Sequence, residues 1–219
     1  MSKTKYSLQE LQDKLYSAVI SDSLDSLGFK HQSPDLDFRP YTGIDKLVGR
    51  AKTTLWADMF KEDPNPYALE LKAVDDCQDG DILVAAAGGS RRSGIWGELL
   101  STAARNSGCV GAVIHGATRD IAQIRKMQFP VFATASRLYD SLHRQRVIDI
   151  DVPVEMGGVI IEPGSLLFCD QDGIVVIPLE VEEEAVSRAM TKVDAENTTR
   201  DAIKSGMKAT AAYEKFGIL

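Results

Sequence analysis

Two short segments of this sequence, residues 97–100 and 116–120, hold the residues best suited to chemistry. Arg119 offers a planar guanidinium that can grip a carboxylate or phosphate at two points. The carboxylate of Asp120, the next residue, is the kind of oxygen ligand that Mg²⁺ or Mn²⁺ prefers. Gly97 would let a ligand approach the backbone closely, and a helix that begins beside it would present unpaired N–H groups to an anion. The pattern indicates a site for a small anion and a divalent cation.

The elements around these segments are expected to bring them to one edge of a parallel sheet. Residues 81–87, 110–116 and 129–134 form three short, buried apolar runs. Helical spacing over residues 98–108 and 120–128 separates these runs. This strand–helix order predicts βαβ units with parallel strands, and the loops that leave such strands gather at one edge. The loops after the first two strands are therefore expected to share a pocket.

The outer parts of the chain predict helices at both ends and further strands. Ser7 followed by Glu10 is a capping box, which predicts a helix directly after it. Residues 148–178 alternate like strands with turns between them, which indicates a β-rich layer in the same domain. A charged helix over about residues 179–205 is expected to face solvent or a partner subunit. Residues 1–219 are thus predicted to be a single α/β domain, with a central parallel βαβ portion and a β-rich layer between terminal helices.

Composition and charge narrow the classes of function. A chain of 219 residues, with 44% hydrophobic and 26% charged residues, can bury a sizeable core. Its 25 basic residues against 32 acidic ones give a net charge of -7, which argues against nucleic-acid binding. The three cysteines are widely spaced, the start of the chain is polar, and no apolar run approaches the roughly 18 residues of a membrane span. These features predict a cytoplasmic protein without membrane contact.

Each candidate residue also has an interpretation that needs no ligand. Asp120 is a good N-cap for the helix after it, and the helix dipole alone favours an acidic residue at position 98. Arg119 by itself would be an ordinary surface arginine, and Gly97 and Gly116 would be packing or turn glycines. Other polar residues are weaker candidates: His115 as a structural histidine, the DQDG segment of residues 170–173 as a hairpin turn, and Arg91 and Arg92 as a solvated loop pair.

Residues 97–120, GELLSTAARNSGCVGAVIHGATRD, resemble the signature of the family that groups 4-hydroxy-4-methyl-2-oxoglutarate aldolases with the regulator of ribonuclease E activity A. The shared pattern is Gly-x-Leu-Leu, an alanine-rich helix and a Gly-x-x-Arg-Asp loop. The similarity extends to the segments SDSLDSLG, VGRAKTT, FPVFAT and PGSLLFCDQDGIVVIP, and so covers most of the chain. The resemblance implies a β/β/α fold of the swivelling type.

The aldolase branch of this family implies a role for each matching residue. Backbone groups at the start of the predicted helix would bind the carboxylate of a pyruvyl group together with Arg119. These groups belong to Gly97, Glu98, Leu99 and Leu100. Asp120 would be the direct metal ligand, and Glu98 would help to hold metal-bound water. A glutamate of a neighbouring subunit would complete the site, with Glu196 as the best candidate and residues 182–184 as competitors.

The implied reaction is cleavage of a 4-hydroxy-2-oxo acid to release pyruvate, assisted by Mg²⁺ or Mn²⁺. Oxaloacetate decarboxylation would pass through the same enolate. Arg119 would balance charge and tune a metal-bound water for proton transfer. The resemblance also implies a homotrimer or a dimer of trimers. Two positions depart from the family pattern: His115 stands where aspartate is frequent, and Ser165 replaces the aspartate of a Pro-Gly-Asp motif.

Two other functions compete with the lyase. One is a non-catalytic, protein-binding regulator that resembles the ribonuclease-inhibitor branch of the family. The presence of Glu98 together with Asp120 favours the enzyme, because regulatory members tend to lack the full metal set. The other is a menaquinone methyltransferase, an old label in this family. No glycine-rich motif for S-adenosylmethionine follows the first strand, so the sequence does not support that activity.

Overall fold

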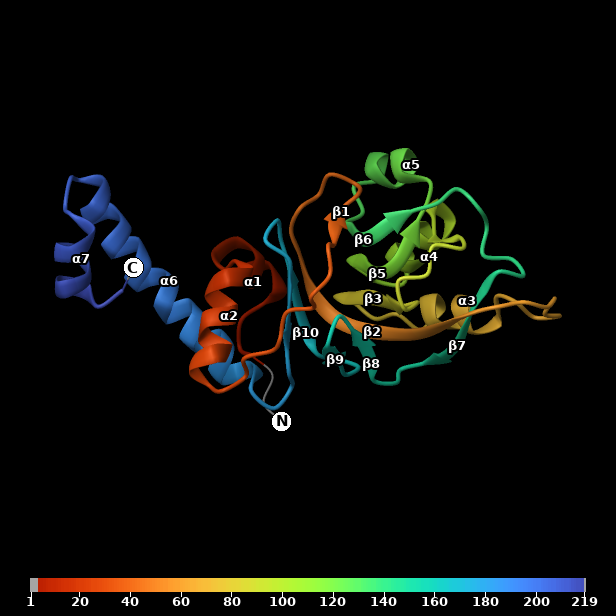
Figure 1. Ribbon diagram of the computed structural model, residues 1–219, viewed down its shortest axis with the longest axis horizontal. Helices are drawn as coiled ribbons and strands as arrows, with labels where there is room; N and C mark the ends of the chain where they lie inside the picture. The colour runs from red at the N-terminus through yellow and green to blue at the C-terminus, as the bar shows by residue number, and fades with distance from the viewer. Residues whose placement is uncertain (1–3, 219) are drawn as a thin grey trace.

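A curled nine-stranded sheet forms the body of the molecule in the computed structural model, which describes residues 4–218 (Figure 1). Four parallel strands lie at its centre in the spatial order β6, β5, β3, β2. Their bounds are Leu47–Asp58 for β2, Asp81–Ala86 for β3, Gly111–Thr118 for β5 and Val131–Ser136 for β6. These strands are almost entirely buried, which matches their apolar sequences. The α/β fold class, with its central parallel portion, is confirmed.

Helices connect the parallel strands in the predicted order. The helix α3 (Ala68–Asp75) leads into β3, α4 (Glu98–Asn106) leads into β5, and α5 (Ile121–Lys126) leads into β6. Gly108 follows α4 with a φ of 92°, a left-handed conformation that glycine adopts without steric cost. The predicted connections therefore place the start of α4 and the end of β5 at the same edge of the sheet.

The short strand β4 (Gly94–Trp96) was not predicted, because its segment was expected to be part of a loop. It runs parallel to the end of β5. Trp96 is only 1% exposed and stacks on Phe129, with the two ring centroids 6.5 Å apart. Burial of this large side chain fixes the segment directly before α4 against the sheet.

The strands of the predicted β-rich layer mostly extend the central sheet. The long strand β2 pairs antiparallel with β10 (Leu166–Cys169) along its first part and with β7 (Gln145–Ile150) along its second part. A hairpin turn over residues 170–173 joins β10 to β11 (Ile174–Ile177), as predicted. The strand β2 is thus long enough to pair with both β10 and β7. The remaining strands are β1 (Arg39–Pro40), which pairs with β6, and the two-stranded pair β8 (Val154–Met156) and β9 (Val159–Ile161).

The terminal helices pack against β10 and β11, on the side of the molecule away from α4 (Figure 1). They are α1 (Leu8–Lys14), which begins at the predicted capping box, α2 (Ser17–Ser26) and α6 (Glu182–Lys204). The helix α7 (Ala209–Phe216) was not predicted. The end of α6 and α7, residues 196–218, form an arm that points away from the sheet (Figure 1). Within residues 4–218, no helix is both long enough and apolar enough to cross a membrane.

Candidate active site

Three loops meet at the edge where the parallel strands β3, β5 and β6 end. The loop after β3 leads through β4 to Gly97 and α4, and the loop after β5 carries Arg119 and Asp120. The loop after β6 carries Asp140. This convergence follows from the parallel order, because such strands all deliver their following loops to one edge. The structure therefore brings Gly97, Arg119 and Asp120 together as expected, while their chemical roles stay predictions.

Asp120 does not cap α5, although it occupies the N-cap position. Its side chain makes no capping hydrogen bond, and its backbone is left-handed, with φ 54° and ψ 28°. The carboxylate oxygen Oδ2 instead accepts a hydrogen bond of 3.1 Å from the backbone N–H of Glu98, at the start of α4. It also lies 3.6 Å from Nε of Arg119. Because the side chain makes no capping bond, the interpretation of Asp120 as a cap of α5 is wrong. A left-handed residue other than glycine costs about 1–3 kcal/mol, and such residues are concentrated at functional sites.

Gly97 leaves the space that the Asp120 carboxylate occupies. A Cβ atom at position 97 would lie 2.5 Å from Asp120 Oδ2 and 3.3 Å from the Arg119 side chain. The φ of Gly97 is −142°, which every residue adopts, so the constraint here is space and not backbone strain. The close packing of Gly97 and Asp120 keeps the carboxylate over the N-terminus of α4.

We expect Gly97→Ala to lower the pyruvate release that the family resemblance implies at least about tenfold, because the new methyl group displaces the Asp120 carboxylate. Its thermal stability should fall only modestly. The control is Gly116→Ala, whose added methyl group would meet Ala87 at 3.2 Å and not Asp120. Steady-state kinetics of both variants make the comparison. Turnover that is unchanged in Gly97→Ala, or equally reduced in both variants, contradicts the close packing as the cause.

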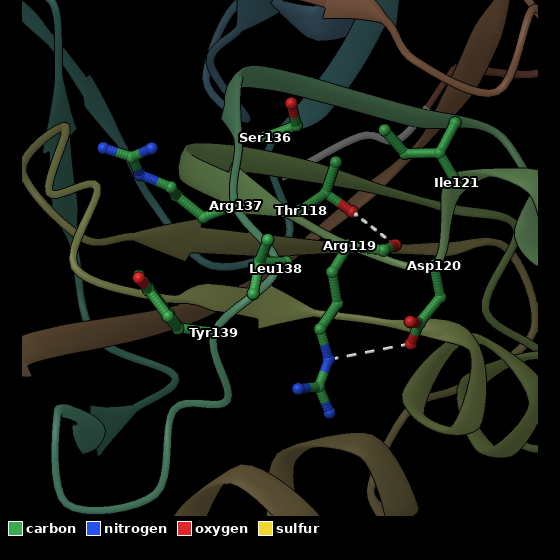
Figure 2. A pocket seen from close by; sticks show the side chains of 8 residues that line it. All are labelled: Thr118, Arg119, Asp120, Ile121, Ser136, Arg137, Leu138 and Tyr139. Carbon is green, nitrogen blue, oxygen red and sulfur yellow. Dashed lines mark hydrogen bonds and ion pairs between the residues drawn. The ribbon is translucent and has the colours of Figure 1, made fainter.

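Two cavities adjoin these residues, and Arg119 and Asp120 line both of them. The larger has a volume of about 440 Å³, and its wall includes the segment from Ser136 to Tyr139. The smaller has a volume of about 290 Å³ and lies between α3, α4 and the Asp140 loop. Figure 2 shows the side chains of Arg119 and Asp120 next to each other, joined by their ion pair, while Arg137 points away from them. The two residues thus form a shared wall between the cavities.

Asp140 and Tyr67 hold Arg119 from the side of the smaller cavity. Asp140 Oδ2 lies 2.8 Å from Nη2 of Arg119, and the Tyr67 hydroxyl donates a hydrogen bond of 2.7 Å to Asp140 Oδ1. Partial burial would raise the pKa of Asp140, but the Leu142 N–H, the Tyr67 hydroxyl and the Arg119 charge outweigh it and lower this pKa. Burial and the hydrogen bond to Asp140 raise the pKa of Tyr67 to about 12. Arg119 is therefore held between the carboxylates of Asp120 and Asp140.

Glu70 is a buried acid in the wall of the smaller cavity. Glu70 is only 6% exposed, and its carboxyl oxygen Oε2 has no hydrogen-bond partner. Burial raises the pKa of Glu70 to about 8; the negative charge of Asp140 adds to this effect and the positive charge of Arg119 opposes it. A carboxyl group without partners in such a place is costly, and it is unusual in a folded protein.

We expect Glu70→Gln to stabilise the protein more at pH 9 than at pH 5. The pKa of Glu70 rises from 4.5 to about 8 on folding, so the folded state binds more protons between these values. The stability of the wild type therefore falls as the pH rises through this window, by an amount on the order of a few kcal/mol. Glutamine cannot ionise, so the variant should not lose this stability as the pH rises. Thermal denaturation at pH 5, 7 and 9 measures the difference, and a difference that does not change with pH contradicts the burial of an ionising group.

The family model described as "RraA-like: Aldolase/RraA" matches residues 17–176. The chain belongs to the RraA-like family. The aldolase and ribonuclease-regulator resemblance seen in residues 97–120 is thereby confirmed. The match ends within β11, so α6 and α7 lie outside the part that defines the family.

Three relatives place this RraA-like chain among named proteins. It is 31% identical over 197 residues to a putative 4-hydroxy-4-methyl-2-oxoglutarate aldolase of Halalkalibacterium halodurans, covering 90% of this chain and 89% of the relative. It is 29% identical to Protein DlpA of Legionella pneumophila over 91% of this chain, but it spans only 32% of the length of DlpA. The crystal structure of Streptomyces coelicolor RraAS2, described as an unusual member of the RNase ES inhibitor RraA protein family, superposes with a TM-score of 0.76 and 27% identity, over 91% of this chain and 98% of RraAS2.

The other predicted residues of this RraA-like site differ in their position relative to the two cavities. The side chain of Glu98 accepts a hydrogen bond of 2.9 Å from Thr102 and lines neither cavity, whereas its backbone N–H donates to Asp120. Its role in holding metal-bound water stays a prediction. Leu99 and Leu100 line the smaller cavity, whereas His115, expected close to the site, lines neither of the two. Burial lowers the pKa of His115, which agrees with a structural histidine.

Glu196 belongs to α6, which lies on the side of the molecule away from α4 (Figure 1). It accepts a hydrogen bond from Tyr16 and lies 3.6 Å from Arg200 and 4.0 Å from Lys192. A role for Glu196 in catalysis would therefore require the site of a neighbouring subunit, as the resemblance implies.

The donor atoms at the site fit a hard divalent cation held by few protein ligands. Among residues 4–218, no group of three or more His, Cys, Asp or Glu side chains gathers to hold a metal. The Asp120 side chain is 42% exposed and offers oxygen to both cavities. Mg²⁺ commonly binds through one or two carboxylates and keeps several waters. Asp120 is thus a suitable direct ligand, and substrate and water would complete the coordination.

Proposed function

We propose that this protein is a lyase that depends on a divalent metal and cleaves the C3–C4 bond of a 4-hydroxy-2-oxo acid to release pyruvate. The observation that carries the proposal is the position of Asp120 Oδ2 at the N-terminus of α4, beside the guanidinium of Arg119. An anion-binding group and a hard oxygen ligand thus lie in one wall, as a metal-bound 2-oxo acid requires. The aldolase name of the Halalkalibacterium relative supports the same reaction.

Arg119 and the first turn of α4 would bind the carboxylate of the substrate. The first N–H groups of a helix have no partner within the helix, and the helix dipole favours an anion there. Gly97 leaves room for the Asp120 carboxylate, which takes the Glu98 N–H, so the substrate would use the N–H groups that follow it in the first turn. Leu99 and Leu100 line the cavity at this end of the helix. Asp140 holds one side of the Arg119 guanidinium, so that the arginine enters the cavity in a fixed orientation.

Asp120 would hold the cation, which when bound supplies a Lewis acid that stabilises the enolate of pyruvate. Arg119 lies within 3.6 Å of this carboxylate and balances the negative charges of the site. Oxaloacetate would lose carbon dioxide to give the same enolate. We therefore propose oxaloacetate decarboxylation as a second reaction of this site.

The test is a coupled assay of pyruvate release from 4-hydroxy-4-methyl-2-oxoglutarate and from oxaloacetate. Each substrate is assayed with Mg²⁺, with Mn²⁺ and after chelation by EDTA. Release that requires added cation is the expected result. No release from either substrate with either cation contradicts a lyase and favours the protein-binding regulator, the class in which RraAS2 is described.

We also propose that the chain assembles as a homotrimer or a dimer of trimers. The arm supports this assembly, because it leaves the body of its own chain (Figure 1). Glu196, the glutamate proposed for a neighbouring site, lies where the arm begins and pairs with Tyr16. It also carries Ile203 and Tyr213, which are 36% and 56% exposed. These apolar side chains would be covered by a neighbouring subunit.

Light scattering at micromolar concentration is expected to give the mass of three or six chains. Truncation of the chain before residue 196 should shift this mass towards a single chain, because the arm is then absent. A full-length protein that stays monomeric would contradict both the assembly and a site that includes Glu196.

A further inference from the structure

The carboxyl group of Glu70 has hydrogen-bonding capacity that no protein group uses. Four buried side-chain atoms in the described part of the chain have no partner, and they belong to Glu70, Trp96, His115 and Gln145. Of these residues, only Glu70 lines one of the two cavities at Arg119 and Asp120. Buried polar groups are normally paired, so an orphaned one in the wall of a cavity points to a ligand.

Glu70 lines the same cavity as the groups that would hold the 2-oxo acid, but it comes from a different element. Glu70 comes from α3, whereas Gly97 comes from the start of α4, and Arg119 and Asp120 come from the loop after β5. All four residues line the smaller cavity. If the carboxylate and 2-oxo group of a substrate lie at Arg119 and Asp120, the carbon atoms beyond them extend into the remaining space of this cavity. Glu70 lines that space.

We propose that Glu70 is a catalytic residue that accepts the proton of the substrate's 4-hydroxyl group while the C3–C4 bond breaks. This inference rests on the proposed lyase function. The electron pair of the O4–H bond forms the new carbonyl at C4, and the electron pair of the C3–C4 bond remains on the pyruvate enolate. C3 then takes a proton from water, and Glu70 returns its proton to solvent. The balance is one 4-hydroxy-2-oxo acid to one pyruvate and one oxo compound.

The other acidic groups of the cavity are less suited to this proton transfer. Asp140 accepts hydrogen bonds from Tyr67 and from the Leu142 N–H and pairs with Arg119, and these contacts lower its pKa. Asp120 accepts from the Glu98 N–H and is the proposed ligand of the cation. The raised pKa of Glu70, about 8, agrees with a base that binds a proton well near neutral pH.

The test compares two reactions in Glu70→Gln, because only one of them needs a base for a hydroxyl proton. Cleavage of 4-hydroxy-4-methyl-2-oxoglutarate removes the O4 proton, whereas decarboxylation of oxaloacetate does not. Loss of a general base lowers turnover by about 10²–10⁴-fold. We therefore expect at least about a hundredfold loss of kcat for cleavage and less than about a threefold change for decarboxylation. Oxalate, an analogue of the enolate, should bind the variant and the wild type with equal affinity in calorimetry.

Asp75→Asn is the matched control, because Asp75 is an exposed acid of the same helix that lines neither cavity. It should leave both reactions unchanged. Equal loss of both reactions in Glu70→Gln, or no loss of cleavage, overturns the role of Glu70. A wild-type protein that acts on neither substrate overturns the lyase function itself, so the two failures are distinguishable.

Discussion

Asp120→Ala is expected to abolish metal-dependent pyruvate release while the protein stays folded. Asp120 is the proposed direct ligand of the cation, so its loss removes the group that holds the metal at the site. The carboxylate makes no capping hydrogen bond to α5, but it accepts from the Glu98 N–H at the start of α4, so its loss also costs about 0.5–2 kcal/mol of stability. The variant does place alanine in a left-handed conformation, which costs about 1–2 kcal/mol. Pyruvate release at saturating Mg²⁺, with circular dichroism for folding, makes the measurement.

The control for this variant is Asp120→Asn, because asparagine tolerates the left-handed backbone and keeps the shape of the side chain. It lacks the negative charge, so it should be almost as inactive as alanine and more stable. Activity near that of the wild type in either variant would show that Asp120 only shapes the backbone at the start of α5. Activity in Asp120→Asn alone would show that the cation does not need this charge.

Arg119→Lys is expected to lower substrate affinity by ten- to a hundredfold although the positive charge is kept. Nη2 of the guanidinium pairs with Asp140, and Nε lies near Asp120, so the two nitrogen atoms contact different carboxylates. Lysine has one nitrogen atom and cannot keep the contact with Asp140 while it binds a carboxylate at two points. Loss of a charge-assisted hydrogen bond is worth about 1.5–3 kcal/mol. Turnover should fall further if Arg119 also assists proton transfer.

Arg39→Lys provides the matched control for this second prediction. Arg39 also pairs with an aspartate, Asp37, at 2.7 Å, but their side chains are 67% and 75% exposed and lie outside both cavities. Such a surface pair should tolerate lysine within about 0.5 kcal/mol. Oxaloacetate decarboxylation at saturating Mg²⁺ gives kcat and KM for both variants. Unchanged constants in Arg119→Lys would place this arginine outside the binding site.

The parts of the fold that the sequence predicted correctly are those with strong, local patterns. Buried runs that alternate with helical spacing define β3, β5 and β6, and the capping box at Ser7 defines the start of α1. The strand β4 was missed because its pairing depends on the burial of Trp96, which is a tertiary effect. The extension of the sheet by β7 and β10 was missed because it depends on the length of β2, and periodicity does not give strand partners.

The sequence predicted only some of the residues of the candidate site. Gly97, Arg119 and Asp120 could be placed together because parallel strands deliver their loops to one edge. The same rule applied to β6 would have brought Asp140 to that edge. Glu70 also had a signal: with Ala73 and Val74 it has the i, i+3, i+4 spacing of the buried face of α3. Nothing in the sequence indicates that its carboxyl group lacks a partner, because that depends on which side chains surround it.

The arm has a consequence for how the molecule moves through a liquid. A body with a projecting pair of helices experiences more friction than a sphere of equal mass (Figure 1). A single chain with its arm extended would therefore leave a gel-filtration column early and sediment slowly, as a larger sphere would. Assembly that folds the arms between subunits would make the particle rounder while its mass rises. The frictional ratio from sedimentation velocity should accordingly decrease as the concentration of the protein is raised through the assembly range.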